Sequence, residues 1–125
     1  MTGDYGKNSG LLGILGGSGI LDDMGWYGGN SDGQTHLVGQ KKANDWGYHD
    51  MHGNVWACCN DWFGGYDGVA IDPSGPASGV FRVLCGGGWH DNAWSCRSAI
   101  RIGDNPYSRA LIYGFRLCCS AGPRE

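Results

Sequence analysis

Hydrophobic and polar residues alternate in this chain only over short stretches, and these stretches predict strands. Residues 80–84 (VFRVL) form the clearest one, because they are β-branched or aromatic and run into three glycines. Residues 55–59 predict a second strand, in which Trp56 enters the core after a turn at Gly53-Asn54. Residues 35–40 predict a third. Leucine-rich runs are few, which argues against a helical bundle and favours a loop-rich fold.

Two sets of residues interleave in the stretch from Arg82 to Arg116, and the second of them shows neither strand-like nor helical hydrophobic order. One set consists of small, aromatic or guanidinium residues of the kind that fix a backbone: Gly86, Gly87, Gly88, Trp89, Ala93, Trp94, Cys96, Arg97, Ala99, Arg101, Pro106, Arg109, Gly114, Phe115 and Arg116. The other set is irregular and comprises His90, Asp91, Asn92, Ser95, Ile100, Ile102, Gly103, Asp104, Asn105, Tyr107, Ser108, Ala110, Leu111, Ile112 and Tyr113. A scaffold that carries irregular clusters predicts a ligand-binding surface at these fifteen positions.

The composition indicates a single domain of 125 residues, with a glycine-rich N-terminal segment at residues 1–33. Twenty-five glycines against four prolines predict a chain that turns often. Six tryptophans and six tyrosines supply the buried area that helices would otherwise provide. The net charge is −3 and the nine lysines and arginines are scattered, so we expect no nucleic-acid partner.

An apolar run at residues 11–21 is short and broken by glycines, and only Lys7 precedes it. It falls below the length of a spanning helix and lacks the layout of a signal peptide. We therefore expect no membrane span and interpret the run as irregular, core-facing chain. The localisation of the protein stays open.

Two polar clusters raise the question of a metal ion. His49, Asp50 and His52 are ligand types, but their spacing matches no closed metal site, and strand alternation would put the histidines on opposite faces. Hydrogen-bonding histidines in a turn are the preferred interpretation. For Asp22 and Asp23, formation of a surface turn is preferred over a cation site.

The six cysteines are Cys58, Cys59, Cys85, Cys96, Cys118 and Cys119. Their number is even, but two adjacent pairs make an unusual disulfide framework, and no Cys-x-x-Cys spacing indicates zinc. We expect most of them to be small buried apolar residues in a reducing compartment. One disulfide from a doublet to Cys85 or Cys96 remains an alternative.

Several short motifs together resemble the C-terminal half of the formylglycine-generating enzyme, or sulfatase-modifying factor, domain. They are His52-Gly53-Asn54-Val55-Trp56, Asp61-Trp62, Arg82-Val83-Leu84, Gly86-Gly87-Gly88-Trp89, Cys96-Arg97-Ser98-Ala99 and Gly114-Phe115-Arg116-Leu117. The resemblance covers about residues 21–117 and implies an α+β, C-type lectin-like fold, loop-rich, with short antiparallel strands and little helix. The family's N-terminal half has no counterpart here, so we expect a fold that is N-terminally trimmed or completed by another chain.

The resemblance also implies where the family's chemistry would lie. The oxidase binds copper with two cysteines, which fall on Asp91 and Cys96 of this sequence. A lone thiolate cannot make a two-sulfur site, so we expect no catalytic residue and no copper. The family's Val-Trp-Glu-Trp-Cys run is Val55-Trp56-Ala57-Cys58-Cys59 here, and the lost carboxylate argues against calcium, with Asn54 left as a candidate ligand. A copper-dependent oxidase, or a degenerate relative of one, is the alternative function.

A second group with this fold resembles the chain more closely: the variable proteins of diversity-generating retroelements, which display a hypervariable surface near the C-terminus. Mutated asparagine codons in that system cannot encode Trp, Met, Lys, Glu or Gln, and the fifteen irregular positions contain none of these. These types make up 15 of the 125 residues, so chance alone would give such an absence about one time in seven. The resemblance implies a non-catalytic protein that binds a protein or other macromolecule, and it is compatible with display on a cell or virion surface.

Residue chemistry assigns roles within this hypothesis. Tyrosines with short polar neighbours resemble the composition of antibody paratopes, so Tyr107 and Tyr113 are the expected anchors. A core position is the alternative for three apolar members of the set, Ile100, Leu111 and Ile112. Four arginines are expected to hold the scaffold by bonding loop carbonyls or stacking on tryptophans: Arg97, Arg101, Arg109 and Arg116.

Overall fold

The computed structural model describes residues 20–66, 68–69 and 73–119. Its regular elements are short: α1 (Leu21–Met24), β1 (Gly25–Trp26), β2 (His52–Gly53), β3 (Trp56–Trp62), β4 (Arg82–Cys85), the 3-10 helix η2 (Ala93–Cys96), β5 (Ile102–Asp104) and β6 (Tyr113–Gly114). The little helix and the many loops agree with the expected fold class. Within the described ranges no helix has the length and apolarity needed to cross a membrane.

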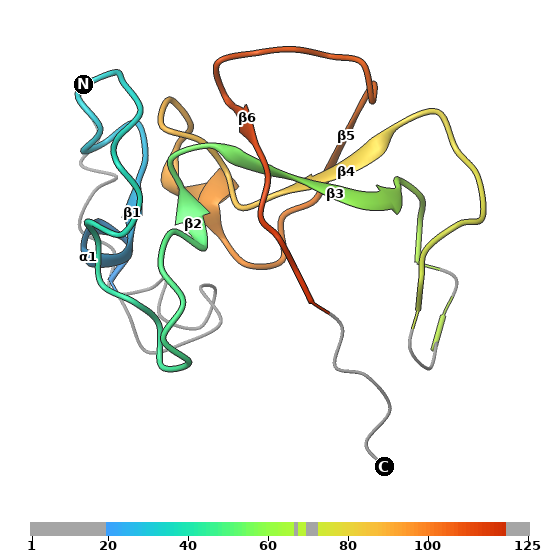
Figure 1. The fold of residues 1–125 in the computed structure, drawn as a ribbon, viewed down its shortest axis with the longest axis horizontal. Coiled ribbons are helices and arrows are strands. Elements are labelled where there is room, and N and C mark those ends of the chain that lie inside the picture. Colours follow the sequence, from blue (N-terminus) through green and yellow to red (C-terminus); the bar gives the residue numbers. More distant parts are fainter. Residues whose placement is uncertain (1–19, 67, 70–72, 120–125) are drawn as a thin grey trace.

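The strands form two sheets (Figure 1). The larger has the order β5-β4-β3-β6, with β4 antiparallel to both β3 and β5, and with β6 parallel to β3. The smaller is the parallel pair β1-β2. The register between β3 and β4 shifts after Cys58, where β3 has a bulge that lets it run on to Trp62.

A small core cluster forms where α1 and its following turn meet η2, from Leu21, Tyr27 and Cys96 with Ala93 packed against them. The buried apolar side chains of the described residues are Leu21, Met24, Tyr27, Trp56, Val83, Leu84 and Cys96. The Tyr27 hydroxyl donates to the Asp22 carboxylate over 2.7 Å, so the polar end of this ring has a partner. Burial, followed by that carboxylate, raises the pKa of Tyr27 to about 12.

Gly53 and Asn54 join the two sheets. Both have positive φ, at 72° and 62°. A Cβ on Gly53 would lie 2.1 Å from the carbonyl oxygen of Trp26, so only glycine fits beside β1. The Asn54 amide holds the chain at His36 from both sides, accepting from its N–H over 2.9 Å and donating to its carbonyl over 3.0 Å.

Three expectations from the sequence need correction. Residues 35–40 are not a strand, because side-chain contacts with Asn54 replace a ladder there and Leu37 and Val38 are exposed. The strand expected at residues 80–84 is Arg82–Cys85, and the two residues before it are exposed. Of the six cysteines, all within the described residues, only Cys96 is buried, and none of them forms a disulfide.

The strand expected at residues 55–59 is confirmed in part. It begins at Trp56 as β3, and the Trp56 side chain is buried as expected. Of the apolar run at residues 11–21, the structure describes only Ile20, which is exposed, and Leu21, which belongs to the core. The remainder of that run lies outside the described residues.

Candidate ligand-binding surface

None of the fifteen irregular positions is buried. Tyr107 and Leu111 are almost fully exposed, at 88% and 86%. The alternative that placed Leu111 in the core is therefore wrong, whereas Ile100 and Ile112 are partly buried. Among the residues interleaved with them, Cys96 is buried, whereas Trp94 is exposed; Val83 and Leu84, which precede them on β4, are buried.

The positions fall into two groups. The first, from His90 to Ser95, lies at the start of η2. The second, residues 102–113, follows β5, its long connection and β6, and Figure 1 shows that connection as a wide arch that leaves the sheet on one side. Ile100 lies between the groups. We call the first group the η2 group and the second the arch.

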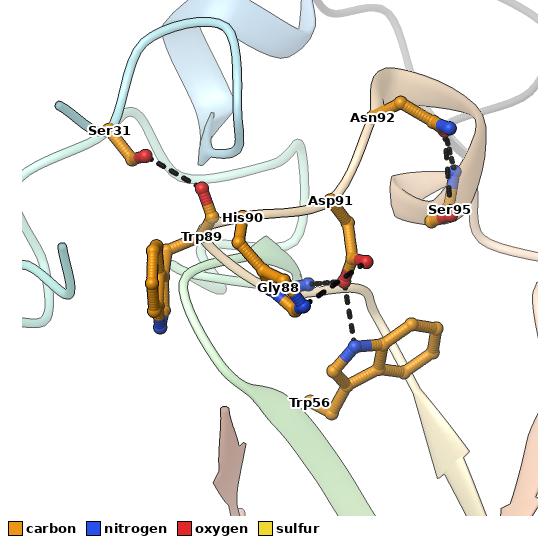
Figure 2. A network of polar contacts seen from close by, with 8 residues as sticks. All are labelled: Ser31, Trp56, Gly88, Trp89, His90, Asp91, Asn92 and Ser95. Carbon is orange, nitrogen blue, oxygen red and sulfur yellow. Dashed lines mark hydrogen bonds and ion pairs between the residues drawn. The ribbon is translucent and has the colours of Figure 1, made fainter. Parts of the chain in front are cut away.

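Asp91 of the η2 group is tied to the scaffold (Figure 2). One carboxylate oxygen accepts hydrogen bonds from the indole N–H of Trp56 over 2.7 Å and from the backbone N–H of Gly88 over 2.8 Å. Its carbonyl accepts from the N–H of Gly28 over 2.7 Å. Charge-assisted bonds of this kind are stronger than neutral ones, so Asp91 links β3, the glycine run and the N-terminal part of the chain.

Asn92 and Ser95 stabilise the first turn of η2. The Asn92 side-chain oxygen accepts from the Ser95 backbone N–H over 3.2 Å, as an N-cap does. Nearby, the Ser31 hydroxyl donates to the Trp89 carbonyl over 2.6 Å and anchors the segment that leads into this turn. His90 is exposed, with Nε2 3.9 Å from the Asp91 carboxylate. In the η2 group His90 is thus the side chain left turned to solvent.

The base of the arch is closed by one side-chain pair. The Tyr113 hydroxyl, from β6, donates to the Asp104 carboxylate, from β5. This bond raises the pKa of Tyr113 to about 12 and, with the backbone N–H of Asn105, lowers the pKa of Asp104. The pair joins the two edge strands of the sheet, which are not neighbours in the strand order.

The arch itself is held by local backbone contacts. Asn105 accepts the Tyr107 N–H through its side chain over 2.9 Å and the Ser108 N–H through its carbonyl over 2.9 Å. The Tyr113 N–H donates to the Ala110 carbonyl over 3.2 Å. These turns fix the backbone and leave the Tyr107 and Leu111 side chains pointing into solvent.

The arginines act largely as expected. Arg97 stacks over Trp94 at 3.7 Å, and Arg101 lies over Tyr66 at 4.7 Å from its ring centroid. Arg116 donates to the carbonyls of His49 and Asp50 over 2.7 and 3.1 Å. Arg109 is exposed. Three of the four guanidiniums therefore support neighbouring loops or rings.

The donor set at Asp91 and Cys96 does not fit the two-thiolate copper site of the oxidase. Cys96 is fully buried, and burial, with a smaller effect of the Asp91 carboxylate, raises the pKa of its thiol to about 12. The Asp91 oxygen already binds Trp56 and Gly88. One protonated thiol and one occupied carboxylate do not supply two soft anionic ligands.

The other candidate ligands are also engaged. The Asn54 amide is used on both sides by His36, so it is not free to bind calcium. Nδ1 of the buried His52 lies 2.6 Å from the Cys96 carbonyl, and Nδ1 of His49 lies 2.8 Å from the Lys41 carbonyl. Both histidines are therefore hydrogen-bonded as expected, but His52 lies in β2 and not in a turn. Asp22 and Asp23 belong to α1, and Asp23 pairs with Lys42 over 2.8 Å. In the described ranges no three His, Cys, Asp or Glu side chains gather as a metal site.

One feature was missed by the sequence reasoning. A cavity of about 800 Å³ lies beside β3 and is lined by none of the fifteen positions. Its lining includes Cys59 on β3 and Cys85 on β4. Both cysteines lie on or directly after strands expected from the sequence, but the pairing of those strands required the structure.

The chain is similar to one family of domains and to a solved structure. Residues 21–121 match the model of the sulfatase-modifying factor enzyme 1-like domain. Treponema denticola variable protein 1 superposes with a TM-score of 0.74 at 37% identity, covering 88% of this chain and 38% of that one. The match supports the C-type lectin-like fold expected from the sequence.

Two relatives of this chain have names that refer to different activities. The chain is 37% identical to the formylglycine-generating enzyme of Streptomyces coelicolor, over 70% of this chain and 30% of the enzyme. It is 44% identical to the serine/threonine-protein kinase pkn1 of Chlamydia caviae, over 64% of this chain and 13% of that protein. The chain thus spans less than a third of the length of either relative.

Proposed function

The chain belongs to the family of sulfatase-modifying factor enzyme 1-like domains, and on this premise we propose that it is a non-catalytic ligand-binding module with a variable surface. The surface comprises the η2 group, Ile100 and the arch. The ligand is a protein or other macromolecule, and the surface is diversified by a retroelement, as the resemblance to variable proteins suggests.

The observation that carries this proposal is the division between surface and scaffold. All fifteen positions are at least partly exposed, while Val83, Leu84 and Cys96, interleaved with them or just before them, are buried. Substitution at an exposed position away from special contacts usually changes stability by no more than about 0.5 kcal/mol. A surface of this kind accepts many sequences without loss of the fold.

The chemistry of the arch suits recognition of a macromolecule. Tyr107 and Leu111 offer exposed aromatic and aliphatic area, and local turns hold their backbone in place. Aromatic side chains of this kind give large contact area at low cost in conformational entropy. Tyr113 is half-buried and bonded to Asp104, so Tyr107, rather than Tyr113, is the stronger anchor.

The test is the natural variation of this gene, sequenced deeply in its source population. We expect substitutions at the fifteen positions, with Leu84, Gly87 and Cys96 fixed. An adenine-rich copy of the coding sequence for residues 82–116 beside a reverse transcriptase gene would add independent support. Uniform, low variation across residues 82–116 would refute diversification.

The identity with formylglycine-generating enzymes raises an oxidase as the second candidate. Its test is uptake of oxygen by the purified, reduced protein with copper and a thiol substrate. The buried Cys96 thiol and the engaged Asp91 carboxylate predict no uptake above the level of free copper. Copper-dependent uptake that Cys96→Ser abolishes would favour the oxidase instead.

A further inference from the structure

The cavity beside β3 has the size and the lining of a site for a small molecule. Its volume of about 800 Å³ lies within the range of roughly 300–1,000 Å³ that is common for ligand sites. Such sites are mostly apolar, with a few polar groups that orient the ligand. Most of this lining is apolar too, and Trp46, Met51, Val55 and Leu117 contribute to it. None of the fifteen irregular positions lines the cavity, so it is separate from the candidate ligand-binding surface.

Asp50, a charged residue of this lining, has a partner for only one of its two carboxylate oxygens. Oδ2 accepts a hydrogen bond from the backbone N–H of Gly39 over 2.7 Å. Oδ1 is closed to bulk solvent, and no described residue donates to it. A carboxylate oxygen removed from water is costly unless a donor meets it. A ligand that brings a positively charged donor into the cavity would therefore complete this group.

The guanidinium in the lining, that of Arg116, does not fill this role. Its Nη2 donates to the backbone carbonyls of His49 and Asp50 over 2.7 and 3.1 Å. Among the described residues no ion pair joins Arg116 to the Asp50 carboxylate. Asp61 adds a second carboxylate to the lining, but it is exposed, so solvent and salt screen its charge. The lining thus favours a ligand with a positive charge near Asp50.

We propose that the cavity binds a small apolar molecule that carries one protonated amine. The amine donates to Oδ1 of Asp50, and the apolar body lies against Trp46 and Met51. Gly39 holds the carboxylate and Arg116 holds the backbone of Asp50 before the ligand arrives, so binding needs little reordering of the site. A neutral molecule of the same shape leaves the oxygen without its donor. The inference does not depend on the proposed function, and either can fail alone.

The experiment compares two probes of the same shape on the full chain by isothermal titration calorimetry at neutral pH. The probes are 1-naphthylmethylamine, which is protonated, and 1-naphthylmethanol, which is neutral. We expect the amine to bind at one site per chain and about 10-fold or more tightly than the alcohol, because hydrogen bonds to charged groups are the stronger kind. Backbone amide NMR signals that shift with the amine should include Asp50, Met51 and Gly86, which line the cavity, and not Tyr107 of the arch.

Asp50→Asn removes the charge and should weaken binding of the amine by about 10-fold or more, while binding of the alcohol stays unchanged. Asparagine also tolerates a positive φ, so it suits the backbone of Asp50, whose φ is 56°. Asp32→Asn is the matched control, because Asp32 has a φ of 54°, is exposed and lies outside the cavity lining.

Circular dichroism of both variants separates loss of the site from loss of the fold. Three results would overturn the proposal: binding of neither probe, an amine that binds no more tightly than the alcohol, or an Asp50→Asn variant that keeps the preference for the amine. Equal weakening by Asp32→Asn would also count against it, because the effect would then follow from net charge and not from the cavity.

Discussion

The η2 group and the arch resemble each other in sequence and differ in how they are held. Asp91 in the η2 group bonds the scaffold at Trp56 and Gly88 and also reaches Gly28, whereas Asn92 caps the turn of its own group at Ser95. Tyr107 and Leu111 in the arch are almost fully exposed, and the arch is held by its own residues, through local turns and the Tyr113–Asp104 pair. A position can therefore lie at the surface and still belong to the scaffold.

This comparison narrows the surface proposed for recognition. Exposure favours His90, Ile102, Tyr107, Ser108 and Leu111 as the positions that are free to change. Asp91 is partly exposed but engaged in two side-chain hydrogen bonds. We expect replacement of Asp91 to affect folding as well as binding, and replacement of the exposed arch residues Tyr107 and Leu111 to affect binding alone.

The largest effect we expect is the difference in stability between two variants that carry the same substitution, one in the scaffold and one in the arch. Leu84 on β4 is 3% exposed and Leu111 is 86% exposed. Leu84→Ala should lower the free energy of unfolding by about 2–5 kcal/mol, because it removes buried contacts and leaves a cavity. Leu111→Ala should change it by no more than about 0.5 kcal/mol. Urea denaturation of both variants measures the difference, and equal losses would contradict the division.

The next effect concerns Asp91. Asp91→Ala should lower the free energy of unfolding by about 1.5–3 kcal/mol, because it leaves the Trp56 indole N–H and the Gly88 N–H without their acceptor. His90→Ala, at the exposed neighbour, is the control and should cost no more than about 0.5 kcal/mol. If the two variants unfolded at the same urea concentration, Asp91 would not be part of the scaffold.

A smaller effect is expected at the start of η2. Asn92→Ala removes the side-chain acceptor of the Ser95 N–H and should lower the free energy of unfolding by about 0.5–1 kcal/mol. Asn92→Asp retains a capping oxygen and should preserve stability. Amide hydrogen exchange at Ser95 reports on the cap directly, and unchanged protection in Asn92→Ala would show that the cap has no role.

The smallest effect concerns protonation at the base of the arch. In the folded protein, the Tyr113 hydroxyl holds the pKa of Asp104 below its usual value. This contact therefore adds to the free energy of unfolding at pH values above the unfolded-state pKa of Asp104. The contribution is lost as the pH falls through the folded-state pKa. The raised pKa of Tyr113 gives a second pH dependence. The contribution of this contact to the free energy of unfolding is complete below pH 10 and is lost as the pH rises to about 12.

Tyr113→Phe should remove both dependences. Carbon NMR titration of the Asp104 carboxyl should then show its pKa moving up toward the ordinary value for aspartate. Tyr107→Phe is the matched control, since the Tyr107 ring is exposed and should leave the pKa of Asp104 where it is. An unchanged Asp104 titration in Tyr113→Phe would exclude the hydrogen bond between them.

The fold class followed from the joint set of motifs, and the strand at Trp56 followed from β-branched and aromatic residues after the turn at Gly53-Asn54. Residues 35–40 had the same local character but form no strand, because the amide of Asn54, eighteen residues from His36, binds their backbone instead. A contact between residues so far apart in the sequence leaves no pattern in the residues around either of them. The strand at 80–84 was displaced to 82–85 for a related reason, since its pairing with β3 and β5 sets its ends.

The candidate surface was predictable as a set but not position by position. Irregular patterning located His90–Tyr113 outside the core, yet it gave no sign that Asp91 accepts from Trp56, thirty-five residues earlier. It also missed the cavity beside β3, because the residues that line it come from parts of the chain that are far apart in the sequence. Long-range side-chain pairing is the information that the sequence patterns lack.

The most direct test of a fixed scaffold with a replaceable surface is a deep mutational scan of residues 82–116, scored by protease resistance of the displayed chain. We predict that Ile102, Tyr107, Ser108, Ala110 and Leu111 accept nearly every residue type, whereas Leu84, Gly87 and Cys96 accept almost none. Gly87 is included because a Cβ there would lie 2.7 Å from the Cys96 sulfur. If substitutions in the arch lowered protease resistance as much as substitutions in the scaffold, the division into a fixed scaffold and a replaceable surface would be wrong.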